Sequence, residues 1–167
     1  MGGKAKKAKP GTQSLAQDPD CIQQKSKISE HTIQDCIFCK IIQGKIPCSK
    51  ILEDNDFLAF MDIRPINKGH VLIVPKAHCT NILDFPRAEE TDLVEFMKKV
   101  AKAVVKATGA DGFNLGMNNG PAAGQVVMHA HFHIIPRFKG DGLASWPHKE
   151  YLPGEIDSLR DKIASFL

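Results

Sequence analysis

An alternation of histidine with apolar residues near position 130 is the feature that most restricts how this chain folds. The stretch "HAHFHIIP" places His129, His131 and His133 at every second position of an apolar run. Side chains two residues apart in a β-strand point to the same face of the sheet. The alternation therefore predicts a strand that carries three imidazoles on one face and packs its apolar residues into the core with the other.

Core packing accounts for the apolar residues of this strand but not for the three imidazoles. Three interpretations are open: an exposed polar face, a metal site formed by alternate histidines, and phosphoryl chemistry with a neutral imidazole as nucleophile. The preceding loop "NNGPAAGQ" favours the third, because glycine amides approach a phosphate closely and Asn and Gln side chains donate hydrogen bonds. No carboxylate flanks the histidines, which weakens the case for a catalytic metal.

Periodicity over the rest of the chain predicts an α+β fold with about five antiparallel strands. "SKILED" and "FLAFMDI" flank a turn at 54–56 and predict a hairpin, and "HVLIVP" is typical of a central strand buried on both faces. "GFNLGMN" and "HAHFHIIP" complete the sheet. One short helix is predicted in "DCIFCKIIQG", and one long helix over 88–108, where apolar residues recur at helical spacing.

The first 34 residues differ in composition from the remainder of the 167-residue chain. They hold six lysines and three acidic residues, which is the whole net charge of +3, and show little apolar clustering. We therefore expect a disordered basic tail over residues 1–34 and a neutral folded domain with its C-terminal segment over 35–167. A neutral domain argues against nucleic-acid binding other than weak contacts through the tail.

The sequence shows neither a membrane segment nor an export signal. No apolar run approaches the roughly 20 residues that span a bilayer, and no apolar segment follows the charged "MGGKAKKAKP". The five cysteines are an odd number, which predicts a reducing compartment without structural disulfides. We expect a cytoplasmic protein, with the nucleus as a second location.

Five motifs occur in one order between about residues 35 and 141: "CIFCKI", "FMDIRPINKGH", "VPKAH", "NNGPAAGQ" and "HAHFHIIPR". In this combination they resemble the small Hint-like and HIT-like members of the histidine triad (HIT) superfamily of nucleotide hydrolases and transferases. The resemblance implies a HIT-like fold of the α+β class, a homodimer and a purine nucleotide as substrate.

The resemblance also implies a role for each histidine of the active site. His131 attacks the α-phosphorus of a nucleotide conjugate and forms a nucleotidyl-histidine that water hydrolyses, so its attacking nitrogen must be uncharged. His133 contacts the phosphate and assists with charge or with the leaving group's proton. His70 matches the family's distant fourth histidine, although a lone histidine at the start of a strand is more often structural.

The resemblance further implies a set of contacts with the nucleotide. These are Asp62 with the ribose hydroxyls, Asn118 and Gln125 with the phosphates, and Phe38, Ile46, Phe60 and Ile63 around the base. The four apolar residues fit a plain core equally well, and Asp62 alone would be taken for a turn aspartate.

One departure from the family pattern leaves the substrate open. Better-studied branches place Ser or Thr, which can assist the leaving group, where this chain has Val126. A methyl group donates no proton, so either another group does this or the leaving group departs unaided. Nucleoside phosphoramidates, aminoacyl adenylates and dinucleoside polyphosphates all stay open as substrates. The alternatives are a nucleotide-binding interaction module with vestigial catalysis and a catalytic zinc enzyme that uses all three histidines.

Cys36 and Cys39 have the spacing of half a tetrahedral zinc site, a spacing that two small buried hydrophobic residues would also show. Some microbial HIT proteins with this pair complete the site with the histidine of "PKxH" and the first histidine of the triad. The resemblance thus implies that His78 and His129 join the cysteines around a structural zinc ion. Such a site has no open coordination position, and no catalytic cofactor is expected.

Overall fold

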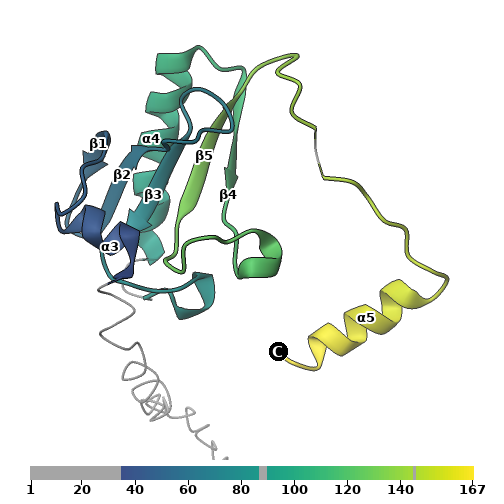
Figure 1. Cartoon of the computed structure of the whole chain (residues 1–167). Helices are drawn as coiled ribbons and strands as arrows, with labels where there is room; N and C mark the ends of the chain where they lie inside the picture. Colours follow the sequence, from purple (N-terminus) through teal and green to yellow (C-terminus); the bar gives the residue numbers. More distant parts are fainter. Residues whose placement is uncertain (1–34, 87–89, 145) are drawn as a thin grey trace, which may run out of the picture. The chain divides into compact units, whose positions relative to one another are not determined.

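The computed structural model describes residues 35–86, 90–144 and 146–167 (Figure 1). The chain separates into two compact units, one that ends at Arg137 and one over Phe138–Leu167. The predicted basic tail over 1–34 lies outside the described residues. Of the described helices, none is both long enough and apolar enough to cross a bilayer.

The first unit contains the predicted five-stranded antiparallel sheet. Its strands are β1 (Lys50–Glu53), β2 (Phe57–Met61), β3 (Val71–Pro75), β4 (Gly112–Gly116) and β5 (Phe132–Arg137). They lie in the order β1-β2-β3-β5-β4, so the hairpin of β1 and β2 continues into β3, and β4 forms the far edge (Figure 1). The central strand β3 is buried over its whole length.

Two helices pack against opposite faces of this sheet, and together with it they confirm the α+β class. The long helix α4 (Glu90–Thr108) and the short helix α3 (Ile37–Ile42) correspond to the two predicted helices (Figure 1). Residues of β2 alternate between the two layers: Phe57 and Ala59 join the core cluster under α4, whereas Leu58 joins the cluster under α3. The sheet is therefore covered on both sides.

The alternation in the histidine segment is present, but its strand is shorter than predicted. β5 begins at Phe132, so His129 and His131 precede it. Pairing between β3 and β5 also starts at Phe132. Just before it, the amide of Ala130 donates to the carbonyl of Cys79 at 2.7 Å, so this part of the chain bonds to the loop after β3 instead of to the strand.

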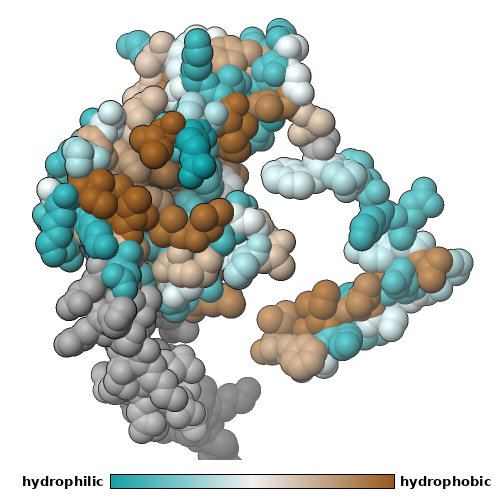
Figure 2. Space-filling model, in the orientation of Figure 1, coloured by the Kyte–Doolittle hydropathy of each residue, from teal (hydrophilic) through white to brown (hydrophobic). Residues whose placement is uncertain are grey.

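The second unit contains a helix that was not among those predicted, α5 (Glu155–Ala164). Acidic residues in its first turn and Lys162 in its last turn suit the helix dipole. Apolar side chains lie on its exposed surface (Figure 2), among them Ile156, Leu159 and Ile163. These three residues recur at helical spacing, but none of the residues of α5 is buried.

Candidate functional site

His131 is buried directly in front of β5, and its contacts determine which ring nitrogen is free to react. Nδ1–H of His131 donates to the backbone carbonyl of His129 at 2.7 Å. The lone pair of the neutral ring is therefore on Nε2, as a nucleophile requires. The ring of Phe38, from α3, contacts this imidazole edge-on with centroids 5.2 Å apart, which restricts its rotation.

Hydrogen bonds link His133 to His70, the distant histidine of the prediction. Nε2 of His70 is 2.9 Å from Nδ1 of His133. The amide of Ile66 donates to Nδ1 of His70 at 3.3 Å, and in the tautomer that accepts this bond His70 carries its proton on Nε2 and donates it to His133. Nε2 of His133 then carries an N–H that is buried and has no hydrogen-bond partner among the described residues. This N–H is available as a donor to a substrate.

Burial keeps both of these imidazoles neutral. Burial lowers the pKa of His133 to about 4, and charge on His131 or His70 lowers it further, against the opposing effect of the Asp62 carboxylate. Burial likewise lowers the pKa of His70, which Asp62 also opposes. At neutral pH the pair can therefore donate and accept hydrogen bonds without holding a fixed positive charge.

Asp62 lies beside this pair at the end of β2. Its Oδ2 is 3.3 Å from Nδ1 of His70, and its Oδ1 accepts a hydrogen bond from the amide of Arg64 at 2.8 Å. The side chain is 18% exposed, so part of the carboxylate faces solvent. Asp62 can therefore contact both a buried imidazole and a ligand.

Gln125 holds the glycine-rich loop together, which differs from the predicted contact with phosphate. Its Oε1 accepts from the amide of Gly120 at 2.7 Å, and its Nε2 donates to the carbonyls of Thr80 at 2.6 Å and Val127 at 3.0 Å. The side chain is buried and both of its N–H bonds are committed. Asn118, the other predicted donor, is half-buried, and its side chain donates a long hydrogen bond, 3.5 Å, to the carbonyl of Gly124 in the loop.

The residues predicted to surround the base differ in exposure. Phe38 and Phe60 are buried in the cluster under α3 with ring centroids 5.8 Å apart, as expected of core residues. Ile46 is partly buried. Ile63, directly after Asp62, is 91% exposed. Of these four side chains, Ile63 therefore offers the largest surface to a ligand.

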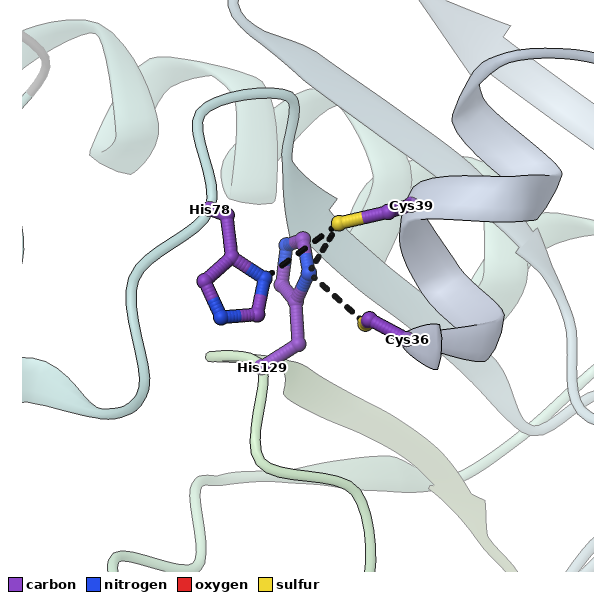
Figure 3. A group of neighbouring side chains, drawn as sticks. All are labelled: Cys36, Cys39, His78 and His129. Atoms are coloured by element: carbon purple, nitrogen blue, oxygen red, sulfur yellow. Dashed lines mark hydrogen bonds between the residues drawn. The ribbon is translucent and has the colours of Figure 1, made fainter. Parts of the chain in front are cut away.

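Cys36, Cys39, His78 and His129 converge where α3 meets the segment before β5 (Figure 3). Their ligand atoms all lie within 4.8 Å of one another. Nδ1 of His129 is 3.4 Å from Sγ of Cys36 and 3.5 Å from Sγ of Cys39, and Nδ1 of His78 is 3.3 Å from Sγ of Cys39. A tetrahedral zinc ion at its usual bond lengths holds sulfur and nitrogen ligands about 3.5 Å apart. The four side chains therefore fit such an ion with little movement.

The protonation of this Cys–His group also suits a metal. Burial lowers the pKa of His129 to about 4. Its Nε2–H donates to the carbonyl of Pro75 at 2.9 Å, which directs the Nδ1 lone pair toward the thiols. Burial raises the pKa of the Cys39 thiol to about 12, and the neighbouring Cys36 raises it further. A metal that binds here must therefore displace thiol protons, which makes its affinity depend on pH.

Two backbone groups and one side chain that were not predicted from the sequence complete the site. The carbonyl of Pro75 orients His129, and the amide of Ile66 orients His70. Oδ1 of Asn119 accepts from an amide of the loop after β3 at 3.0 Å and so ties that loop to the glycine-rich loop. Of these groups only Asn119 carries a local signal, as a polar side chain inside "NNGPAAGQ".

The sheet order, the histidines just before and at the start of β5, and the adjoining Cys–His group define a protein of the histidine triad class. A family model described as the HIT domain matches residues 43–140, more than half of the chain. The chain belongs to the HIT domain family.

Relatives with named activities are similar over most of the chain. It is 42% identical over 132 residues to adenosine 5'-monophosphoramidase hnt1 of Schizosaccharomyces pombe, a match that covers 78% of this chain and 96% of that protein. It is 46% identical over 118 residues to adenylylsulfatase HINT3 of Arabidopsis thaliana, covering 70% of this chain and 60% of that protein. A solved zinc-bound histidine triad family protein from Mycobacterium smegmatis is 32% identical, with a TM-score of 0.63 and coverage of 81% and 99%.

Proposed function

We propose that this protein is a nucleotide hydrolase that cleaves the bond between the α-phosphate of a purine nucleotide and its leaving group. The orientation of His131 carries this proposal, because its Nδ1–H is committed to the His129 carbonyl and Nε2 is left as a neutral nucleophile. The two relatives named for adenylyl substrates support adenine as the base. Nucleoside phosphoramidates, aminoacyl adenylates and dinucleoside polyphosphates are the candidate substrates.

The reaction has two steps. In the first, Nε2 of His131 forms a bond to the α-phosphorus while the bond to the leaving group breaks with its electron pair. Nε2–H of His133, the buried donor without a partner among the described residues, donates a hydrogen bond to the departing atom, and the leaving group takes its proton from solvent water. In the second step water attacks the phosphorus, the phosphorus–nitrogen bond breaks with its electron pair returning to Nε2 of His131, and the proton of the attacking water passes to solvent.

The hydrogen bond from His70 supports the role of His133 as a donor to the leaving group. His70 donates to Nδ1 of His133 over 2.9 Å, which keeps the proton of His133 on Nε2. This donor matters because Val126 stands where other branches have a hydroxyl, and Val126 is 88% exposed and apolar. His133 therefore provides a hydrogen bond to the leaving group that a hydroxyl at position 126 would share.

The remaining contacts hold the nucleotide. Asp62 accepts from the ribose hydroxyls with the part of its carboxylate that faces solvent. Amides of the glycine-rich loop and the side chain of Asn118 bind the phosphates, and Gln125 keeps that loop in shape through its three hydrogen bonds. Ile63 covers the base from the exposed side.

Trapping the covalent intermediate tests this function. The full chain is mixed with an adenosine phosphoramidate, quenched at alkaline pH to preserve the acid-labile bond, and weighed by intact-mass spectrometry. We expect an added adenylyl group on His131, and none in His131→Ala, which should still bind AMP. Binding of AMP without any adduct in the unaltered protein would indicate an interaction module. Turnover without an adduct that ends on metal removal would indicate a catalytic zinc enzyme.

The Cys–His group holds a structural zinc ion. Two sulfur and two nitrogen ligands occupy all four positions of a tetrahedral ion, which leaves no position for a substrate. The zinc-bound relative from Mycobacterium smegmatis supports the choice of metal. Bound zinc links α3, the loop after β3 and the segment before β5.

We infer that two copies of the chain associate through β4 and α4. β4 is an edge strand, and its Phe113 and Leu115 are 44% and 50% exposed. Beside it lies a hollow of about 440 Å³ lined by Lys98, Ala101, Lys102, Val105, Lys106 and Phe113. An unpaired edge strand with apolar side chains is a template for pairing with another chain. The homodimer that the resemblance implies would cover both features.

A further inference from the structure

His129 contributes to both sites of the molecule with different atoms. Its ring lies in the Cys–His group, where Nδ1 faces the two thiols (Figure 3). Its backbone carbonyl accepts the Nδ1–H of His131 at 2.7 Å. The group that holds the metal and the acceptor that orients the nucleophile are therefore parts of one fully buried residue.

Strand pairing does not fix the position of the His129 carbonyl. Residues 127–129 form a bend, and pairing of β5 with β3 begins only at Phe132. The ring of His129 is held on one side by the carbonyl of Pro75, which accepts from Nε2 at 2.9 Å. On its other side, at Nδ1, the ring is held in place by its contacts with the thiols of Cys36 and Cys39.

The cysteines hold this ring firmly only through a shared ion. Sγ of Cys36 and Sγ of Cys39 lie 3.4 and 3.5 Å from the same Nδ1 of His129. A single lone pair accepts one good hydrogen bond, so in protein freed of metal the two thiols compete for it. A zinc ion instead bonds to Nδ1 and both sulfurs together, and removes that competition.

Helix α3 provides a second link between the two sites. Phe38 lies between Cys36 and Cys39 in sequence, and its ring contacts His129 and His131 with centroids 5.9 and 5.2 Å apart. A change in how the cysteines are held therefore moves the aromatic ring that packs on the nucleophile.

We propose that His129 is a positioning residue, and that metal coordination at its Nδ1 sets the tautomer and direction of His131. This inference rests on the proposed function. Coordination keeps the His129 carbonyl aimed at Nδ1–H of His131, so Nε2 points at the substrate as a lone pair. Loss of coordination lets His131 sample the tautomer with its proton on Nε2, which cannot attack phosphorus. Loss of a partner that orients a metal ligand typically costs 10- to 100-fold in metal affinity or activity, and we expect a loss of that size in the reactivity of His131.

The test compares zinc-loaded protein, chelated protein and two ligand variants, Cys36→Ser and His78→Ala, at a temperature where each is folded. His78→Ala removes a ligand that lies on another segment from the nucleophile. Single-turnover mixing with an adenosine phosphoramidate gives the rate of adduct formation on His131. We expect this rate to fall about 10- to 100-fold in all three altered forms, while the Kd for AMP changes less than twofold.

Val104→Ala is the matched control for lost stability. Val104 belongs to the core cluster under α4, on the opposite face of the sheet from α3. This variant should lower the melting temperature and leave the rate of adduct formation within about twofold of the unaltered protein. An equal loss of rate in Val104→Ala and in the chelated protein at matched stability would overturn the inference.

Nitrogen-15 NMR of the histidine rings supplies a readout that does not depend on turnover. We expect His131 in zinc-loaded protein to show one tautomer, with the proton on Nδ1, and in chelated protein a mixture of both. A single unchanged tautomer after chelation would overturn the inference. Absence of any adduct in the zinc-loaded protein would instead contradict the proposed function, so the two failures are distinguishable.

Discussion

At the scale of single residues, the three histidines of one motif differ because each ring meets a different partner. His129 contacts thiols and a carbonyl, His131 donates to a backbone carbonyl, and His133 accepts from His70. The alternation in "HAHFHIIP" predicts their shared face. It cannot predict these partners, because Pro75, whose carbonyl accepts from His129, lies 54 residues away along the chain.

The low pKa of His133 predicts a loss of stability in acid. Its pKa is about 4 when folded, because of burial, and about 6.5 in an unfolded chain. Above pH 6.5 neither state is protonated and stability is unaffected by this group. As pH falls from 6.5 toward 4 the unfolded chain binds the proton first, so the free energy of unfolding declines over that window.

Urea unfolding at pH 7 and at pH 5 measures this effect. We expect His133→Gln to lose less stability between these two values than the unaltered chain. The difference should correspond to about one proton fewer taken up on unfolding. If both proteins lose the same free energy of unfolding between pH 7 and pH 5, His133 is protonated as easily in the folded as in the unfolded chain.

At the scale of elements, apolar spacing predicts the central strands and α4 because their buried faces determine the pattern. β2 and β3 send alternate residues to two core clusters, and α4 presents Leu93, Phe96 and Val100 to one of them. The start of β5 was predicted too early, because the Ala130 amide bonds to the loop after β3. α5 was not predicted, although Ile156, Leu159 and Ile163 recur at helical spacing, and it buries no residue.

Gly69 marks a close approach between two elements and provides a test of the packing. It precedes β3 with φ of +96°, and a Cβ there would lie 2.6 Å from Cγ2 of Thr108 at the end of α4. We expect Gly69→Ala to lower the free energy of unfolding by roughly 1–3 kcal/mol, because the methyl group overpacks this contact in a strained backbone conformation. Urea unfolding monitored by circular dichroism measures the change.

Two further variants control this substitution. Gly112→Ala adds a methyl group where no heavy atom lies within 4 Å, so its effect should stay within about 0.5 kcal/mol. Adding Thr108→Ser to Gly69→Ala removes the contacting methyl, keeps a hydroxyl for the bond to Val104, and should restore part of the loss. Equal stabilities for Gly69→Ala and Gly112→Ala would show that the approach is not tight.

At the scale of the whole molecule, the site joins segments that are far apart in the chain. Cys36 and His129 are 93 residues apart in the chain, so their proximity can be seen only in the folded structure. The spacing of Cys36 and Cys39 indicates half a zinc site, and only the resemblance to the HIT family adds His78 and His129. Gln125 was expected at the phosphates, yet its amide is used within the protein, because a buried amide must satisfy its own hydrogen bonds.

Metal removal tests the link between these segments. A ligand that binds only the folded state at about 1,000 times its Kd stabilises it by about 4 kcal/mol. In a chain of this size we expect chelation to lower the melting temperature by about 8–16 °C, and added zinc to restore it. Cys36→Ser should melt near the temperature of the chelated protein and respond little to zinc. An unchanged melting temperature after complete chelation would contradict a structural ion.

The oligomeric state of variants at the exposed edge strand β4 tests the association of two copies. Light scattering after size-exclusion chromatography should give twice the 18.4 kDa mass of one chain. Phe113→Lys adds a cation beside Lys98 and Lys102 and removes an apolar contact, so it should yield a monomer. Leu83→Lys, at a residue 90% exposed in another part of the surface, controls for added charge and should stay dimeric. A dimer that withstands Phe113→Lys would exclude the β4 edge as the interface, because a desolvated lysine cluster opposes association by several kcal/mol.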